Sequence, residues 1–290
     1  MIRSSPAFMR AMYNLPRSGT RPLGYGARMD LVQTRRLGSR EARRAATDVR
    51  SRAAAAWRSP AQRRLVVAIV SACLSALAFA HIAEDYVTND PLAHWDVRFA
   101  HWLALERSDL GTEFFRFFTF LGSPAVALAV SAVVCVALYR RRLLVQAALL
   151  PLVLGGAEFL NLGLKLAFHR PRPEVAFVSI DTYSFPSGHA MVSTAAYGAL
   201  AYIAWAYVRS PRRRLLLVAG TTVFVALICF SRLYLGVHYL SDVLAGAAGG
   251  LFWLSVSVAI ITVWGERLVQ WFAGSRADGL GRRITRSSIH

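Results

Sequence analysis

The feature that most constrains the fold of this chain is a series of six apolar segments separated by short polar or basic stretches. Each segment is about as long as a helix that crosses ~30 Å of hydrocarbon. Inside a bilayer, backbone N–H and C=O groups must be satisfied within the protein, so segments of this length are expected to be helical. The sequence therefore predicts an all-α fold, a bundle of six transmembrane helices. The predicted spans cover residues 65–82, 117–139, 143–165, 190–208, 215–232 and 241–264.

Composition and charge agree with a membrane protein. Hydrophobic residues make up 55% of the 290 residues, and charged residues only 17%. The formal net charge of +18 could by itself indicate a nucleic-acid-binding protein. Most of the basic residues, however, lie in tails or in short loops between apolar segments, which is typical of regions retained in the cytoplasm. We therefore predict a partner in the lipid bilayer and no nucleic-acid partner, and the sequence gives no indication of the oligomeric state.

The same pattern divides the chain into three regions. Residues 1–64 hold fifteen arginines and only three acids, so we predict a disordered, basic cytoplasmic tail. An organelle transit peptide would have a similar composition. Residues 65–265 are the predicted membrane domain. Residues 266–290 are predicted to be a second basic cytoplasmic tail.

The arginines also predict the orientation of the chain. A six-span arrangement puts 27 of the 33 arginines on one side, which the rule for basic loops makes cytoplasmic. Both termini then lie in the cytoplasm, at what we expect to be a bacterial cytoplasmic membrane. The loop at 83–112 faces outward. The connections at 166–189 and 232–241 also face outward, yet they carry arginines, and cations at an outer membrane edge need a reason.

A short amphipathic helix is predicted at residues 92–106. Trp95, Phe99 and Trp102 recur there at helical spacing, which favours a helix that lies on the outer membrane surface. An ordinary aromatic belt explains the same residues. In either case the segment would flank a route by which a lipid reaches the outer side.

Two polar clusters on the predicted outer side are suited to bind an anion. Lys165 is the only lysine of the chain, and Arg172 follows it seven residues later, where prolines have ended the helix. Ser187 is the expected N-cap of the fourth apolar segment, where free backbone N–H groups favour phosphate. Gly188 lets an anion approach the backbone closely. His189 lies in the first helical turn.

A third cluster carries a candidate nucleophile. Arg232 ends the fifth apolar segment, and His238 and Asp242 follow with a spacing of four residues. On a helix, that spacing stacks the two side chains on one face. A carboxylate behind a histidine fixes the tautomer of the imidazole and raises its basicity. Taken singly, such features also occur in ordinary surface pairs and at helix ends.

Two residues of the third apolar segment are candidate supports for Lys165. Glu158 and Asn161 precede it at spacings that allow a shared helix face. An intramembrane carboxylate is seldom without function, so we expect both to brace Lys165, with interhelical packing as the alternative. His169 and Arg170, just after Lys165, are expected to be exposed loop residues.

Together, the three clusters resemble the signature of the type 2 phosphatidic acid phosphatase superfamily, which also includes bacterial acid phosphatases and vanadium haloperoxidases. That signature is Lys, six residues, Arg-Pro; then Pro-Ser-Gly-His; then Ser-Arg, five residues, His, three residues, Asp. Every signature position has its counterpart, and the resemblance covers roughly residues 94–265. The matching residues are Lys165, Arg172, Pro173, Pro186, Ser187, Gly188, His189, Ser231, Arg232, His238 and Asp242.

The resemblance implies a role for each residue. His238 would attack phosphorus from its neutral form and become a phosphohistidine, while Asp242 would orient it. His189 would start protonated and donate its proton to the leaving group. No metal and no cofactor are implied. The implied phosphate ligands are Lys165, Arg172, Ser187, Gly188 and Arg232.

The resemblance thus implies an integral-membrane lipid phosphatase whose site opens on the extracytoplasmic face. Its substrate would be a phosphate monoester or diphosphate of a lipid. Candidates are phosphatidic acid, phosphatidylglycerol phosphate, diacylglycerol pyrophosphate and undecaprenyl diphosphate, of which the last is favoured. A lipid phosphotransferase, a lipid A phosphatase and a non-catalytic lipid-phosphate-binding protein are the alternatives. A haloperoxidase is disfavoured because those proteins are soluble.

Overall fold

The structure, a computed structural model, describes residues 47–48, 59–88, 91–178 and 180–287. The described residues form helices and loops and contain no strand, which confirms the all-α prediction. Most of the predicted tail at 1–64 lies outside the described residues. The helices of the unit Pro60–His290 are α3 (Pro60–Thr88), α4 (Pro91–Leu105), α5 (Asp109–Leu121), α6 (Pro124–Arg140), α7 (Leu144–Phe168), α8 (Gly188–Trp205), α9 (Pro211–Tyr234) and α10 (Leu240–Ser287).

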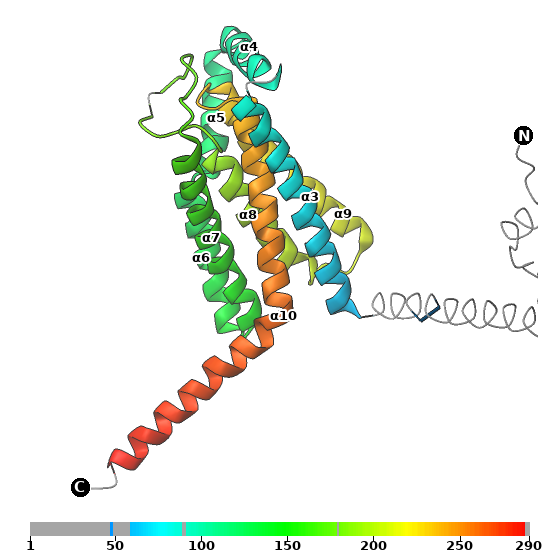
Figure 1. Cartoon of the computed structure of the whole chain (residues 1–290). Helices are drawn as coiled ribbons and strands as arrows, with labels where there is room; N and C mark the ends of the chain where they lie inside the picture. The colour runs from blue at the N-terminus through cyan, green and yellow to red at the C-terminus, as the bar shows by residue number, and fades with distance from the viewer. Residues whose placement is uncertain (1–46, 49–58, 89–90, 179, 288–290) are drawn as a thin grey trace, which may run out of the picture. The chain divides into compact units, whose positions relative to one another are not determined.

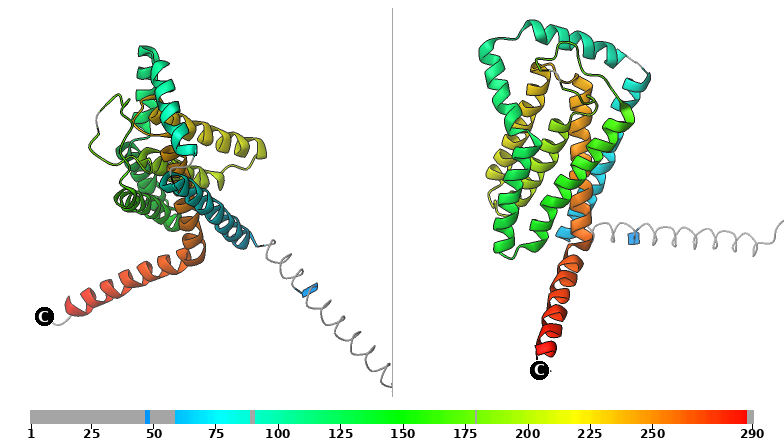
Figure 2. Two further views of the ribbon diagram at one scale, coloured as in Figure 1. Left: turned by 45° about the horizontal axis from the view of Figure 1, so that its top comes forward. Right: turned by 90° about the vertical axis from the view of Figure 1, so that its left-hand side faces the viewer.

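Helix α8 is the centre of the bundle. It packs against α6, α7, α9 and α10, and the views in Figure 1 and Figure 2 show these helices side by side. Most of its buried side chains are small, so neighbouring helices can approach its backbone closely. The buried residues of α8 are Ala190, Met191, Val192, Ser193, Ala195, Ala196, Ala199 and Ile203.

Four helices of the described part are long and apolar enough to cross a membrane. They are α3, α7, α9 and the portion Leu240–Gly265 of α10, and the bent pair α5–α6 makes a fifth if it counts as one span. The fourth predicted span, residues 190–208, corresponds to α8, which is not among these candidates. Its interior position explains the difference, because a helix covered by protein tolerates glycine, serine and tyrosine where a lipid-facing helix needs apolar side chains.

The predicted span at 117–139 is wrong in one respect, because the structure breaks it into two helices. The helix axes of α5 and α6 differ by 46°. Pro124, at the start of α6, has no N–H to continue the hydrogen bonds of α5. Ser123 caps α6 instead, and its side chain accepts a hydrogen bond from the Val126 N–H at 3.3 Å.

Side chains of α8 satisfy the carbonyls at this break. The Tyr197 hydroxyl donates to the Leu121 carbonyl at 2.5 Å, and the Ser193 hydroxyl donates to the Gly122 carbonyl at 3.2 Å. Carbonyls in hydrocarbon need such partners. The bend therefore also fixes α5 and α6 against α8.

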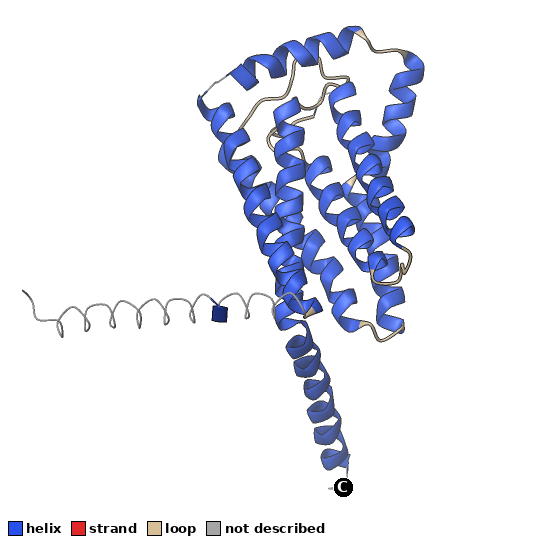
Figure 3. Cartoon of the chain, turned by 90° about the vertical axis from the view of Figure 1, so that its right-hand side faces the viewer, coloured by secondary structure: helices blue, strands red, loops and turns tan. Residues whose placement is uncertain are grey.

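Helix α4 lies across one end of the bundle, as Figure 3 shows. We call this the α4 end. The predicted amphipathic helix at 92–106 is thus confirmed as a helix, but its aromatic residues do not share one environment. Trp95 and Trp102 are exposed, with 60% and 54% of their surface accessible, whereas Phe99 packs on the cluster that contains Leu103 and Tyr234.

Helix α10 approaches α8 through glycines. A Cβ added at Gly246 would lie 2.5 Å from the Ser187 carbonyl oxygen, and one at Gly250 would collide with the Met191 carbonyl. The missing side chains let the first turn of α10 reach the start of α8, where the Ser187 N–H donates to the Asp242 carbonyl at 2.9 Å. At the other end of the bundle, α10 continues as a helix into the predicted C-terminal tail (Figure 1).

We expect Gly250→Ala to destabilise the protein by about 1–3 kcal/mol, because the new methyl group overlaps the backbone of α8. The matched control is Gly163→Ala on α7, where an added Cβ meets nothing within 4 Å. Replacing an open helical glycine with alanine is stabilising by up to ~1 kcal/mol. Denaturation midpoints in detergent would measure both. Equal midpoints for the two variants would contradict the close approach of α10 to α8.

Candidate active site

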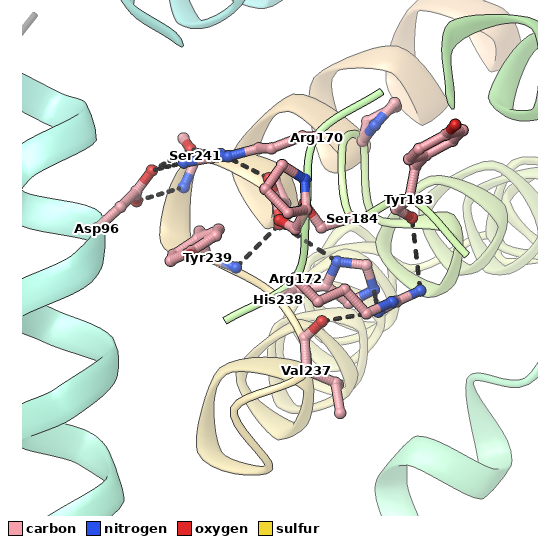
Figure 4. A network of polar contacts seen from close by, with 12 residues as sticks. Asp96, Arg170, Arg172, Tyr183, Ser184, Val237, His238, Tyr239 and Ser241 are labelled. Atoms are coloured by element: carbon pink, nitrogen blue, oxygen red, sulfur yellow. Dashed lines mark hydrogen bonds and ion pairs between the residues drawn. The ribbon is translucent and has the colours of Figure 1, made fainter. Parts of the chain in front are cut away.

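The predicted site residues converge at the α4 end of the bundle. Two loops, 169–187 and 235–239, meet there with the ends of α7, α8, α9 and α10. Figure 4 shows the polar network that these segments build around His238. The three clusters predicted from the sequence therefore form one site.

His238 lies at the centre of the network with only 3% of its surface exposed. Its Nδ1 is 3.4 Å from the Asp242 Oδ2 atom, and its Nε2 is 3.2 Å from the Arg172 Nη1 atom. A guanidinium can only donate, so Nε2 must present its lone pair and Nδ1 must carry the proton. This tautomer lets His238 donate to Asp242 while Nε2 can act as a nucleophile.

The surroundings of His238 keep the imidazole neutral. Burial lowers its pKa well below the ordinary value, and the charges of Arg232, Arg172 and Lys165 lower the pKa further. The lone pair of Nε2 is therefore unprotonated at neutral pH.

Arg172 and Lys165 are held by backbone carbonyls. Arg172 donates from Nε to the Thr182 carbonyl at 2.8 Å and from Nη1 to the Val237 carbonyl at 2.7 Å. The Lys165 ammonium group donates to the carbonyls of Tyr183 and Ser184. The two cations thus tie the 169–187 loop to α7 and to the His238 loop.

Arg232 and Ser187 carry buried polar atoms that have no hydrogen-bond partner among the described residues. Arg232 has 5% of its surface exposed, and its Nη1 donates to the Thr119 hydroxyl at 3.0 Å. Its Nε has no such partner, and the same holds for the Ser187 hydroxyl. Ser187 is the N-cap of α8, as predicted, but its side chain makes no capping bond. A phosphoryl oxygen would satisfy both atoms.

His189 lies beside this set, in the first turn of α8. It lines a cavity of about 530 Å³ together with Arg232, Thr119 and Arg116. A group held in the cavity would therefore lie within reach of His189 and Arg232.

The two predicted supports of Lys165 have different positions. Asn161 is buried, and its amide donates to the Pro186 carbonyl at 3.3 Å. It therefore braces the turn before α8 rather than Lys165. Glu158 is exposed on α7, and among the described residues it forms no hydrogen bond or ion pair with Lys165. Glu158 and Asn161 do share a helix face with Lys165, but the exposed Glu158 side chain points out of the bundle.

The prediction that Arg170 is an exposed loop residue is wrong. Its side chain is 6% exposed, and it forms ion pairs with Asp242 at 2.6 Å and with Asp96 at 2.8 Å. His169 is exposed, as predicted, and ends α7 in the left-handed conformation with φ of 49°.

Sequence reasoning also missed Asp96, which is 1% exposed on α4. The sequence spacing does indicate that Asp96 faces inward. It lies four and seven residues before the buried Ala100 and Leu103, and therefore on the inner face of that helix. Arg170 had a signal as well, because it was one of the few arginines that broke the charge rule. Their pairing could not be inferred, since it depends on how α4 lies across the bundle.

Arg107 was a further arginine without an assigned role, and the structure makes it a structural residue. It donates to the Tyr234 carbonyl at 2.7 Å and to the Val175 carbonyl at 2.8 Å. It thereby joins the end of α9 to the 169–187 loop. Among the described residues, no group of three or more His, Cys, Asp or Glu side chains could hold a metal ion.

The chain is similar in sequence to known proteins. The sequence model of the PAP2 superfamily matches residues 146–266, which contain every signature residue. Phosphatidylglycerophosphatase B of Bacillus subtilis (strain 168) is 33% identical over 137 residues, which are 46% of this chain and 66% of that protein. The chain thus spans about two thirds of that relative's length.

Two solved structures resemble the fold. The crystal structure of a transmembrane PAP2 type phosphatidylglycerolphosphate phosphatase from Bacillus subtilis aligns with a TM-score of 0.57 and 25% identity, over 69% of this chain and 96% of that one. The crystal structure of Aquifex aeolicus LpxE aligns with a TM-score of 0.47 and 24% identity, over 57% of this chain and 94% of that one.

Proposed function

We propose, because this chain belongs to the PAP2 superfamily of membrane lipid phosphatases, that it hydrolyses a phosphate monoester or diphosphate of a lipid through a phosphohistidine. The observation that carries this mechanism is the orientation of His238. Its Nδ1–H faces Asp242, and its unprotonated Nε2 faces the cation Arg172. A neutral nucleophile next to cations is what attack on an anionic phosphate requires.

In the first step, Nε2 of His238 forms a bond to phosphorus as the bond from phosphorus to the lipid oxygen breaks. His189 donates its proton to that oxygen, and the dephosphorylated lipid leaves. In the second step, water attacks phosphorus as the bond from phosphorus to Nε2 breaks, His189 takes a proton from that water, and inorganic phosphate is released. His189 therefore acts as an acid in the first step and as a base in the second, as expected of a double displacement.

Charge and hydrogen bonds at the phosphoryl oxygens would supply most of the catalysis. Two donors are free for this purpose, the Ser187 hydroxyl and the Arg232 Nε. Backbone N–H groups of the first turn of α8, beginning at Gly188, add a helix N-terminus. Lys165 and Arg172 would exchange carbonyl contacts for phosphoryl oxygens. No step in this scheme uses a metal ion or a cofactor.

We propose phosphatidylglycerol phosphate as the substrate to test first. That activity is in the names of both the sequence relative and the solved structure from Bacillus subtilis, and this outweighs the preference for undecaprenyl diphosphate drawn from the sequence. Phosphatidic acid and undecaprenyl diphosphate are the comparison substrates. A phosphotransferase would differ only in the acceptor that takes the phosphoryl group from His238.

The test is release of inorganic phosphate by the purified full chain in detergent, with EDTA present. We expect phosphate from at least one of the three lipids, with oxygen from ¹⁸O-labelled water in the product. Labelled phosphate on a second lipid instead of water would support the phosphotransferase. Activity lost to EDTA and restored by a divalent metal would overturn the metal-free scheme, and no release from any lipid phosphate would overturn the function.

We also propose that α8 and the bent pair α5–α6 complete six spans, with both termini in the cytoplasm and the α4 end outside. The arginine-rich loop at 140–142 supports this orientation. Tags fused to the two termini should resist protease in intact cells and be cleaved after the cells are opened. Cleavage of either tag in intact cells would contradict the orientation.

A further inference from the structure

Arg170 is buried, and it contacts the Asp242 oxygen that does not face His238 Nδ1. Its Nη1 donates to Asp242 Oδ1 at 2.6 Å and to the Ser241 hydroxyl at 2.6 Å. The other oxygen of Asp242, Oδ2, accepts from the Tyr239 N–H at 2.9 Å and faces His238 Nδ1. The two oxygens of this carboxylate therefore have different partners, and Arg170 holds one of them.

Arg170 is itself held from several directions. Its Nη2 donates to Asp96 Oδ2 at 2.8 Å. The rings of Tyr86 and Tyr239 lie 4.6 Å and 4.2 Å from the guanidinium carbon, close enough for cation–π attraction. Ser241 completes the contact, since its hydroxyl and its N–H both donate to Asp96. The guanidinium thus has one fixed position among α3, α4 and α10.

The charges around Arg170 disfavour any rearrangement of its ion pairs. Two buried carboxylates, those of Asp96 and Asp242, share the single cation Arg170. Breaking a buried pair leaves an uncompensated charge, which is strongly unfavourable. Asp242 also needs a cation behind it to remain ionised, because only an ionised carboxylate accepts the Nδ1–H of His238 without competing for its proton.

We propose that Arg170, aligned by Asp96 of α4, is a positioning residue that fixes Asp242 behind His238. This inference rests on the proposed phosphohistidine mechanism. Arg170 sets the plane of the Asp242 carboxylate by holding Oδ1, so that Oδ2 is directed at His238 Nδ1. Asp96 lies outside the segment that the superfamily model matches, so the site is completed by a helix that the signature does not include.

The test is a kinetic comparison of Arg170→Lys and Arg170→Met with the wild type in detergent. Loss of an orienting partner typically costs ~10–100-fold in activity. We expect kcat to fall about 100-fold in Arg170→Met and about tenfold in Arg170→Lys, which keeps the charge but not the two-pronged donor. KM should stay unchanged in both, because Arg170 does not contact the phosphate. Unchanged kcat in a folded Arg170→Lys protein would overturn the proposal.

A double-mutant cycle separates positioning from general stability. If Arg170 acts through Asp242, Arg170→Met should lower kcat no further in an Asp242→Asn background. Equal factors in both backgrounds would overturn the proposal. Asp96→Asn should lower kcat several-fold with KM unchanged. If Arg170→Met fails to fold, the kcat values of Arg170→Lys and Asp96→Asn decide the question.

A readout without substrate keeps this inference distinct from the proposed function. Nitrogen-15 NMR of imidazole-labelled protein reports the hydrogen bond that His238 Nδ1 donates to Asp242. We expect the Nδ1–H tautomer in both proteins, because Arg172 still donates to Nε2, and a changed Nδ1 chemical shift in Arg170→Lys. An unchanged Nδ1 chemical shift in the variant would overturn the inference even if the lipid assays succeed. Failure of every lipid assay would overturn the function alone.

Discussion

His238→Ala should abolish phosphate release, by a factor of at least ~10⁴, while leaving the protein folded. Removing the nucleophile of a covalent mechanism costs about as much activity as removing the whole set of catalytic groups. The His238 ring bonds to Arg172 and Asp242, and it lies in the loop 235–239 rather than in a helix of the bundle, so we expect its truncation to leave the helices packed. Initial rates of phosphate release from micelles would measure the effect, after the folded state has been checked by its denaturation midpoint.

The matched control is His81→Ala, an exposed histidine of α3, which should retain wild-type rates. A second measurement identifies the intermediate. Wild-type protein quenched during turnover with labelled lipid should carry an acid-labile phosphoryl group on His238, and the alanine variant should carry none. Turnover by His238→Ala at a rate near the wild type would refute the phosphohistidine mechanism.

Lys165→Arg should lower kcat about 100–1,000-fold, the cost of losing one preorganised donor to a developing charge. The Lys165 ammonium group is a compact charge held by the carbonyls of Tyr183 and Ser184. Arginine is longer, and its planar fork cannot place a single nitrogen between the same two carbonyls. The charge would be kept, but its distance from the phosphoryl oxygens would change.

The control for this exchange is Arg98→Lys, at an exposed position of α4, which should have wild-type kcat. Lys165→Met should lose at least as much activity as Lys165→Arg, because it also removes the charge. Near-wild-type turnover in Lys165→Arg would show that position 165 needs only a positive charge. That result would remove the reason for the one lysine of the chain to lie there.

Much of the bundle was predictable because hydrophobic length is a strong signal in a membrane protein. The segments predicted at 143–165 and 241–264 begin within one residue of α7 and α10. The break between α5 and α6 was missed because the mean hydropathy of the sequence gives no sign of it. Its local signal was present in Gly122-Ser123-Pro124, which combines a helix end, a cap and a residue without an N–H.

The site residues that belong to one sequence motif could be predicted to lie together. Those that only the helix topology brings together could not. The four-residue spacing of His238 and Asp242 was sufficient to predict that their side chains lie together. Arg170 and Asp96 are 74 residues apart, and only the position of α4 brings them together. Glu158 shows a different limit. Helical spacing shows which residues share a face, but in a bundle surrounded by lipid it does not show whether that face points inward.

The way in which Arg172 and Lys165 are held has a consequence for the end of each catalytic cycle. In the part of the chain that the structure describes, neither these two cations nor Arg232 lies within ion-pair distance of a carboxylate. Backbone carbonyls hold Arg172 and Lys165 without neutralising their charges. A phosphate can therefore enter without breaking an ion pair. The same charge remains after hydrolysis, when the site contains only inorganic phosphate. We therefore expect these charges to slow product release, and we expect inorganic phosphate in the surrounding medium to inhibit the reaction.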